Sequence, residues 1–255
     1  MSRPPLSLQA PLLRFVATSL VFGTAVLGLA ACGDDDGGGT ADGSPSKATA
    51  TATSVKGNVA AQSALGKKIN ETAVPESMAD GRRLGAADAK VVIEAYEDFG
   101  CPHCLDFTAN IEPRILQEYV TSGKVAFEYR YFPLRQLTAG AAIAAECASA
   151  QNRFWPFHRA LFIAQAEAAE RTGPSLTEAF ALANLKKIAA DAGLDPASFE
   201  TCVVGDTALN AVQADLKKAN ELGLPGTPSF VVNGQVTPTP EDYAAWKKLL
   251  DSLLK

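Results

Sequence analysis

The feature that most constrains this chain is a pair of β-prone segments joined by a single helical pattern. Residues 91–96 read Val-Val-Ile-Glu-Ala-Tyr, a mostly apolar run typical of a central strand, and residues 124–132 alternate between apolar and polar side chains. A helical pattern fills residues 105–121 between them, and Gly123 ends it. Two strands bridged by a helix of this length predict a βαβ unit, and therefore an α/β fold.

The sequence after this unit predicts a helical block and then a return to the sheet. Residues 138–222 carry Ala, Leu and charged residues at helical spacing, which predicts four or five helices with breaks near Asn152, Gly173, Gly193 and Gly205. Residues 227–234 predict a strand that ends in an Asn-Gly hairpin turn, and its partner strand begins at residues 235–237. A final amphipathic helix is expected over residues 240–254, with Pro240 at its start.

The N-terminal segment has the composition of an export signal. Arg3 and Arg14 supply positive charge, residues 15–31 form an apolar run that ends in small residues, and Cys32 follows Leu-Ala-Ala. This order is typical of a secretory signal. The cysteine resembles the lipobox of bacterial lipoproteins, in which it carries lipid after cleavage. An uncleaved membrane anchor is the alternative, because a run of about 17 residues is at the lower limit for a span. Both interpretations place the remaining chain outside the cytoplasm.

The segment that follows Cys32 reads as a flexible tether. Residues 33–66 are rich in Gly, Asp, Ser, Thr and Ala and contain almost no large apolar side chains. Such a stretch cannot bury enough surface to fold on its own. Residues 66–83 are ambiguous and leave room for one edge strand.

The chemistry of the chain centres on Cys101-Pro102-His103-Cys104, which lies between the first strand and the helix. A cysteine at a helix N-terminus meets unpaired N–H groups and the positive end of the helix dipole, so the pKa of Cys101 should fall. Cys104 follows one turn later on the same side, at a spacing that lets the two sulfurs bond or separate. Pro102 suits the first helical turn, and a protonated His103 would stabilise the thiolate further. A more stable thiolate makes the disulfide more oxidising.

Two other uses of a C-x-x-C pair are open to this chain. A zinc site would need two more ligands, and beyond the leader only Cys147, Cys202 and His158 remain, none of them in a second close pair. A purely structural disulfide within the motif would be strained. We therefore expect a redox pair and no metal site.

The motif and its surroundings resemble a known family. A Cys-Pro-His-Cys motif after a strand, a helical insertion, and Gly-Thr-Pro-Ser-Phe at residues 226–230 before the next strand are similar to the DsbA-like proteins with the thioredoxin fold. The resemblance covers about residues 84–254. It implies a central mixed sheet flanked by helices, with an inserted all-helical subdomain. It also implies a cis peptide bond before Pro228, opposite the active site, with Thr227 offering its backbone to an extended substrate segment.

On this basis the chain is expected to divide into five parts. Residues 1–31 are the signal peptide, and residues 32–66 hold the lipidated cysteine and the tether. Residues 67–137 form the first part of the thioredoxin fold, with the Cys-Pro-His-Cys motif. Residues 138–222 form the inserted helical subdomain, and residues 223–255 form the second part of the fold, with the cis-proline loop.

One position departs from the pattern of the family. Its members usually carry a buried acid six residues before the first active-site cysteine, where it helps to move protons, and here that position is Ala95. The side chain of Glu94 should point to the opposite face of the strand from Ala95, and Glu97 lies nearer the turn. We expect one of the two glutamates to take over this proton relay, Glu97 before Glu94, or a water molecule to do so. The alternative is that both glutamates face solvent.

Two further cysteines, Cys147 and Cys202, fall in the helical block. In an oxidising compartment two such cysteines tend to pair. This predicts a structural disulfide that pins the insertion. Two separately buried thiols are the alternative.

These features together predict an exported, lipid-anchored thiol–disulfide oxidoreductase, and first of all a dithiol oxidase that introduces disulfides into reduced exported proteins. The disulfide Cys101–Cys104 would serve as the redox group without another cofactor. The resemblance implies reoxidation by a membrane quinone enzyme of DsbB or vitamin-K-epoxide-reductase type. A monomer is expected, and a net charge of −5 without a basic patch argues against a nucleic-acid partner. The alternatives are a reductase or isomerase fed from the membrane, and a lipoprotein that binds a metal or another ligand.

Overall fold

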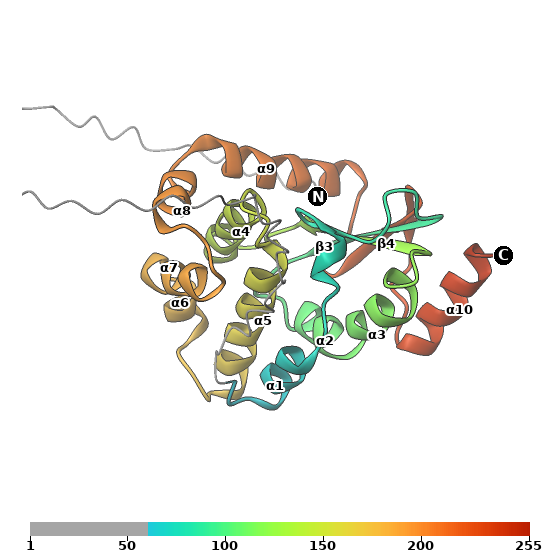
Figure 1. The fold of residues 1–255 in the computed structure, drawn as a ribbon, viewed down its shortest axis with the longest axis horizontal. Helices are drawn as coiled ribbons and strands as arrows, with labels where there is room; N and C mark the ends of the chain where they lie inside the picture. The colour runs from blue at the N-terminus through green and yellow to red at the C-terminus, as the bar shows by residue number, and fades with distance from the viewer. Residues whose placement is uncertain (1–60) are drawn as a thin grey trace, which may run out of the picture. The chain divides into compact units, whose positions relative to one another are not determined.

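The structure is a computed structural model that describes residues 61–255. The predicted signal peptide, Cys32 and most of the predicted tether lie outside the described residues. The described part contains a six-stranded sheet in the order β1-β2-β4-β3-β5-β6 (Figure 1). Its strands are β1 (Ala79–Asp80), β2 (Arg83–Leu84), β3 (Val91–Glu97), β4 (Val125–Tyr131), β5 (Ser229–Val232) and β6 (Gln235–Thr237). β3 and β4 are parallel and the other neighbouring pairs are antiparallel, which confirms the βαβ unit within a mixed sheet.

The crossover between β3 and β4 is broken into three pieces, where the sequence predicted one helix. They are α2 (Pro102–Asn110), α3 (Glu112–Ile115) and a π-helical turn, η2 (Leu116–Val120). The break falls at Ile111, two residues before Pro113. A proline inside a helix removes one backbone hydrogen bond and its ring clashes with the preceding turn, so the chain must bend there.

The helical block lies between β4 and β5, as predicted. It consists of α4 (Gln136–Ser149), α5 (Phe154–Glu170), α6 (Leu176–Ala179), α7 (Leu182–Asp191), α8 (Pro196–Val203) and α9 (Asp206–Glu221). The block thus has six helices, where four or five were expected, and the short α6 is the additional one. A capping box stabilises it: the Ser175 hydroxyl accepts from the Glu178 N–H at 3.4 Å, and the Glu178 carboxylate accepts from the Ser175 N–H at 2.9 Å.

The two faces of the sheet are covered differently. Figure 1 shows α9 on one side of β3 and β4, with α2 and α3 on the other. The α2 side holds the main core, in which Phe107, Phe230 and Trp246 pack ring against ring. On the α9 side, Asp215 accepts a hydrogen bond from the Tyr131 N–H at 3.0 Å and pairs with Arg130. Buried charges are tolerated when they are paired in this way.

Both ends of the described part differ in detail from the sequence-based boundaries. α1 (Ala64–Glu71) begins inside the range predicted as tether, because Ser63 caps it and Glu167 of α5 accepts a hydrogen bond from the Ser63 N–H at 2.9 Å. The turn η1 (Glu76–Met78) follows it. α10 (Tyr243–Leu253) starts three residues later than expected, since Asp242 rather than a proline forms its N-cap. Within residues 61–255, no helix is long and apolar enough to cross a membrane.

Candidate active site

The predicted motif lies at the start of α2, directly after the sheet. Cys101 is the N-cap residue and Pro102 occupies the first helical turn. Cys101 is 8% exposed and Cys104 is fully buried, and both are free thiols. Pro102 and His103 are exposed beside them. Cys101 is therefore the sulfur that a partner molecule can reach.

The cis-proline loop faces the same sulfur. The peptide bond between Thr227 and Pro228 is cis, and the Cys101 thiol donates to the Thr227 carbonyl oxygen at 3.2 Å. The Thr227 hydroxyl is buried and has no hydrogen-bond partner within the described part of the chain. The fold thus brings residues 126 positions apart in the sequence to one point.

The two thiols have opposite pKa shifts. Hydrogen bonding from the Cys104 side chain, helped by the side chain of Thr227 rather than its carbonyl and by the N–H groups of Cys104 and His103, lowers the pKa of Cys101 to about 5 against the opposing effect of burial. Burial raises the pKa of Cys104 well above its ordinary value, and its neighbours Cys101 and Glu97 add to this effect. At neutral pH, Cys101 is therefore a thiolate and Cys104 a thiol. His103 contributes to the lowering through its backbone N–H.

Glu97, the last residue of β3, lies at the buried cysteine. Its side chain is 1% exposed, and neither carboxyl oxygen has a hydrogen-bond partner of good geometry among residues 61–255. Burial raises the pKa of Glu97 well above its usual range; Glu112 and Cys101 raise it further, and the Cys104 thiol opposes them. The side chains of Glu97 and Ala95 are two residues apart on β3 and point to the same face of the sheet, so both are buried in the same core.

Glu94 is not brought to the cysteines. It has the opposite parity on β3, and its carboxylate pairs with Arg130 at 2.7 Å on the α9 side of the sheet. Of the two acids considered in place of Ala95, only Glu97 is therefore positioned to exchange a proton with Cys104.

Two buried acids near the motif, Asp98 and Glu112, are missing from the sequence-based prediction. The Asp98 carboxylate accepts from the N–H groups of Gly100 and Leu134, both at 2.8 Å, and so joins the loop before Cys101 to the loop after β4. An aspartate two residues before a glycine is a recognisable turn signal. Glu112 follows Cys104 by eight residues, which is two steps of four residues along the helix that the sequence predicts as unbroken. This spacing was the available signal for Glu112.

The family described as Thioredoxin matches residues 77–252. The chain belongs to the thioredoxin family. A relative in Bacillus cereus, named "Probable disulfide bond formation protein D", is 30% identical over 176 residues, which cover 68% of this chain and 78% of the relative. "Disulfide bond formation protein D" of Bacillus subtilis is 26% identical over 68% of this chain and 76% of its own.

Solved structures agree on the fold. Oxidised BdbD from Bacillus subtilis superposes with a TM-score of 0.60 at 24% identity, over 69% of this chain and 93% of that one. Wolbachia pipientis alpha-DsbA1 gives 0.58 at 24% identity, over 68% and 90%. The thioredoxin fold with DsbA-like relatives is thereby confirmed. The chain is a thiol–disulfide oxidoreductase of this family, which exchanges disulfides with protein substrates.

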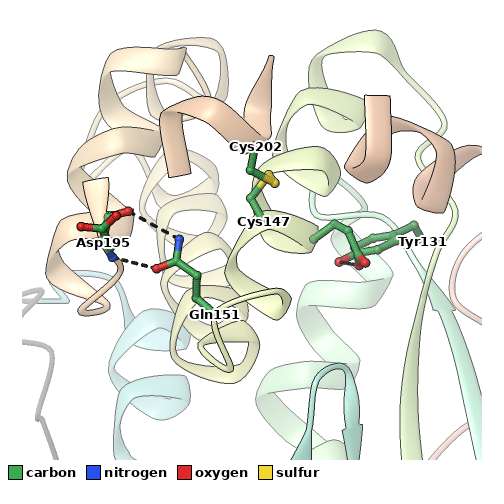
Figure 2. The surroundings of a disulfide bond; sticks show 6 residues. Tyr131, Cys147, Gln151, Asp195 and Cys202 are labelled. Carbon is green, nitrogen blue, oxygen red and sulfur yellow. Dashed lines mark hydrogen bonds between the residues drawn. A yellow bond between two sulfur atoms is a disulfide. The ribbon is translucent and has the colours of Figure 1, made fainter. Parts of the chain in front are cut away.

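In this family member, the other two cysteines of the described residues, Cys147 and Cys202, form a disulfide between α4 and α8. Figure 2 shows the Cys147–Cys202 bond, with a Cα–Cα distance of 5.7 Å, which closes a loop of 55 residues. Beside it, the Gln151 side chain accepts from the Asp195 N–H at 2.8 Å, and its amide group donates to the Asp195 carbonyl at 3.5 Å. Asp195 also caps α8. The two helices are thus joined covalently and by an amide pair.

The remaining candidate ligand, His158, lies in the aromatic core. Its ring packs against Phe99, Tyr129 and Phe162, and burial lowers its pKa to about 3. Among the residues that the structure describes, no group of three or more His, Cys, Asp or Glu side chains is arranged to hold a metal ion.

Proposed function

We propose that the protein is a dithiol oxidase, which introduces disulfides into reduced proteins outside the cytoplasm. The observation that carries this direction is the position of Cys101 at the N-cap of α2, where the Cys104 side chain and backbone N–H groups lower its pKa to about 5. A thiolate stabilised in the reduced protein favours the reduced state, so the Cys101–Cys104 disulfide accepts electrons readily. The relatives' names, which refer to disulfide bond formation, support the same direction.

The reaction would run in two exchange steps. A substrate thiolate attacks the sulfur of Cys101, the bond between Cys101 and Cys104 breaks, and Cys104 leaves and takes up one proton. A second substrate thiolate then attacks the substrate sulfur of the mixed disulfide, and Cys101 leaves as a thiolate. The substrate loses two electrons and two protons, the redox centre gains two electrons and one proton, and one proton goes to solvent.

Glu97 is our choice for the group that protonates Cys104. It is buried at that sulfur, and burial raises its pKa well above the usual range, which favours the protonated carboxyl group. A thiolate that leaves in a buried site needs such a donor, because charging a buried sulfur is costly. Glu97 would then regain its proton after each turnover.

Substrate is expected to bind along the cis-proline loop. The Thr227 carbonyl already lies 3.2 Å from the Cys101 sulfur. An extended substrate segment could pair with the backbone of Thr227, as in strand addition to a sheet edge. This would hold the substrate sulfur over Cys101.

We also propose that the chain is exported and anchored by lipid at Cys32 on the outer face of a bacterial membrane. The leader over residues 1–31 supports export, and the Cys147–Cys202 disulfide fits an oxidising compartment. Residues 33–60 would then act as a tether. A Cys32→Ser variant that still fractionated with membranes would contradict the anchor.

Continuous turnover requires a second enzyme that removes two electrons from the reduced pair. A membrane quinone enzyme of DsbB or vitamin-K-epoxide-reductase type would suit a lipid-anchored partner. We expect the protein to act as a monomer, with no cofactor beyond its own disulfide.

The proposed function can be tested by mixing the oxidised protein with a reduced, unfolded disulfide protein and measuring the thiols that disappear. We expect one substrate disulfide per protein molecule and no activity in Cys101→Ser or Cys104→Ser. When Cys104→Ser is mixed with the oxidised form of the substrate instead, its Cys101 thiolate should attack the substrate disulfide and remain trapped in a mixed disulfide. The Cys147→Ala/Cys202→Ala double variant is the matched control, and it should retain the exchange. If the wild type instead only reduced or reshuffled disulfides, the reductase or isomerase alternative would replace our proposal, and tight stoichiometric metal binding would favour the ligand-binding one.

A further inference from the structure

The loop after β4 is fixed to the residue that precedes the reactive cysteine. The Asp98 carboxylate accepts from the N–H groups of Gly100 and Leu134, both at 2.8 Å. One residue further along the loop, the Arg135 guanidinium donates to the Gly100 carbonyl oxygen at 2.9 Å. Both polar backbone groups of Gly100 are therefore tied to this loop, directly or through Asp98, at the position next to Cys101.

The backbone of this loop is held, whereas its side chains face solvent. Leu134 is 53% exposed, and Arg135 is also an exposed residue. A guanidinium carries five N–H donors, and the bond to Gly100 uses one of them. None of the ion pairs formed within residues 61–255 includes Arg135. A positive charge with unused donors thus lies beside the motif.

The fold itself does not explain the charge of Arg135. Arg82 and Arg130 form ion pairs with the buried Asp215, and in this way they stabilise the packing of α9 on the sheet. Arg135 has only a carbonyl oxygen as its partner, and a neutral amide could make the same bond. The chain carries a net charge of −5, so acidic segments of a partner protein are repelled by most of its surface. A free cation at the motif offers such a segment one attractive point.

We propose that Arg135 is a specificity-determining residue, which binds an acidic side chain next to the reacting cysteine of a protein substrate. The proposal rests on the proposed function, because it requires protein substrates to exchange at Cys101. Residues of an extended segment are about 3.4 Å apart, so the neighbours of the substrate cysteine pass the residues that flank Cys101. A guanidinium binds a carboxylate through two parallel hydrogen bonds. Substrates with Asp or Glu beside the cysteine should therefore exchange faster.

The test uses the full chain with the change Cys104→Ser, and short peptides joined in pairs by a disulfide between their single cysteines. The Cys101 thiolate attacks one peptide sulfur, the bond between the two peptides breaks, and one peptide leaves as a thiolate. The other peptide stays on Cys101, because no neighbouring thiol resolves the mixed disulfide. Peptide mapping by mass spectrometry gives the rate of adduct formation at Cys101 alone.

The peptides differ only in one residue, which is glutamate, glutamine or lysine placed directly before or directly after the cysteine. The measured quantity is the factor by which glutamate accelerates the exchange relative to glutamine. At one of the two positions, this factor should be about threefold smaller after the additional change Arg135→Gln, as expected for loss of an exposed ion pair. The comparison of four rates cancels the intrinsic reactivity of each peptide and any change at Cys101 itself. The effect should shrink at high salt.

Two further variants separate recognition by Arg135 from a general effect of charge. Arg135→Glu should reverse the preference and favour the lysine peptide. Arg153→Gln is the matched control, since Arg135 and Arg153 are both exposed and occupy the N-cap positions of α4 and α5. Arg153 lies instead at Gly193, between α7 and α8, where its Nε would be 3.9 Å from an added Cβ. Its replacement should leave the preference for glutamate unchanged.

A specific result would overturn the proposal. If Arg135→Gln slowed the glutamate and glutamine peptides by the same factor at both positions, Arg135 would serve only to hold Gly100. An equal loss of preference in Arg153→Gln would attribute the effect to net charge. The proposed oxidase function fails on a different observation, namely that the wild type oxidises no reduced protein. Exchange at Cys101 without a preference for acidic neighbours would contradict the role of Arg135 alone.

Discussion

At the scale of single residues, the two sulfurs of the motif differ in charge although one helical turn separates them. Cys101 lies at the start of α2, where N–H groups and the Cys104 thiol stabilise its thiolate, whereas Cys104 is fully buried beside Glu97. The sulfur of Cys101, the more accessible of the two, is thus the better leaving group, and the sulfur of Cys104 needs a proton. Because of this asymmetry, we expect substrates to exchange at the sulfur of Cys101 and not at that of Cys104.

The stability of the reduced protein should therefore depend on pH through Cys101. Its pKa falls from 9.0 to about 5 on folding, so the thiolate contribution is fully present above about pH 9 and is lost as the pH falls to about 5. The contribution is about 5 kcal/mol as an upper bound. Urea unfolding of the reduced wild type and of reduced Cys101→Ser from pH 5 to 9 measures it, and parallel pH profiles of the two proteins would contradict the assignment.

Much of this site could be predicted from the sequence, because its chemistry is local to one motif. The positions of Cys101 and Cys104 follow from a strand, a C-x-x-C and a helix in order. Glu97 could be preferred to Glu94, but whether the Glu97 side chain turns inward could not be predicted, since that depends on how far β3 continues beyond Ala95. The structure extends the strand to Glu97, which turns that side chain inward.

At the scale of elements, the insertion is held by ties between helices that are distant in sequence. The Cys147–Cys202 bond joins α4 to α8, and Gln151 and Asp195 join the same helices beside it (Figure 2). α4 also leads directly from the loop that Asp98 holds against the motif. Hydrogen bonds to Asp98 thus hold this loop in addition to the ties between the helices.

Removing the structural disulfide should lower the free energy of unfolding by about 4 kcal/mol, as expected for closure of a 55-residue loop. The comparison is between the Cys147→Ala/Cys202→Ala variant and the wild type, both with the Cys101–Cys104 pair oxidised. Chemical denaturation measures the difference. Unchanged stability, together with rapid alkylation of Cys147 and Cys202 in untreated wild type, would show that the bond does not form.

Element boundaries were harder to predict than element types. Periodicity indicated a helix after the motif, and it could not show that Pro113 would bend the crossover at Ile111. The same holds for the start of α10, where the capping side chain of Asp242 decides the boundary rather than Pro240. Local hydrogen bonds of this kind are weak signals in a sequence pattern.

At the scale of the whole described part, the insertion and the thioredoxin framework meet at the active site. A side chain at Gly100 would come within 2.5 Å of Thr138 in α4 and 3.4 Å of Leu176 in α6. The residue before Cys101 must therefore be small. The insertion thus forms one wall beside the reactive sulfur, and the cis-proline loop forms another. The fold class could be predicted, because the βαβ unit precedes the insertion in the sequence and the late strand follows it. The packing of α4 and α6 against Gly100 could not be predicted.

The reduction potential of the Cys101–Cys104 pair tests the central claim most directly. It is obtained by equilibrating the protein with glutathione buffers, trapping free thiols by alkylation and measuring the reduced fraction by mass spectrometry. The stabilised Cys101 thiolate predicts an oxidising value, nearer to about −120 mV than to about −270 mV. A potential at or below about −270 mV would contradict the oxidase function and favour a reductase.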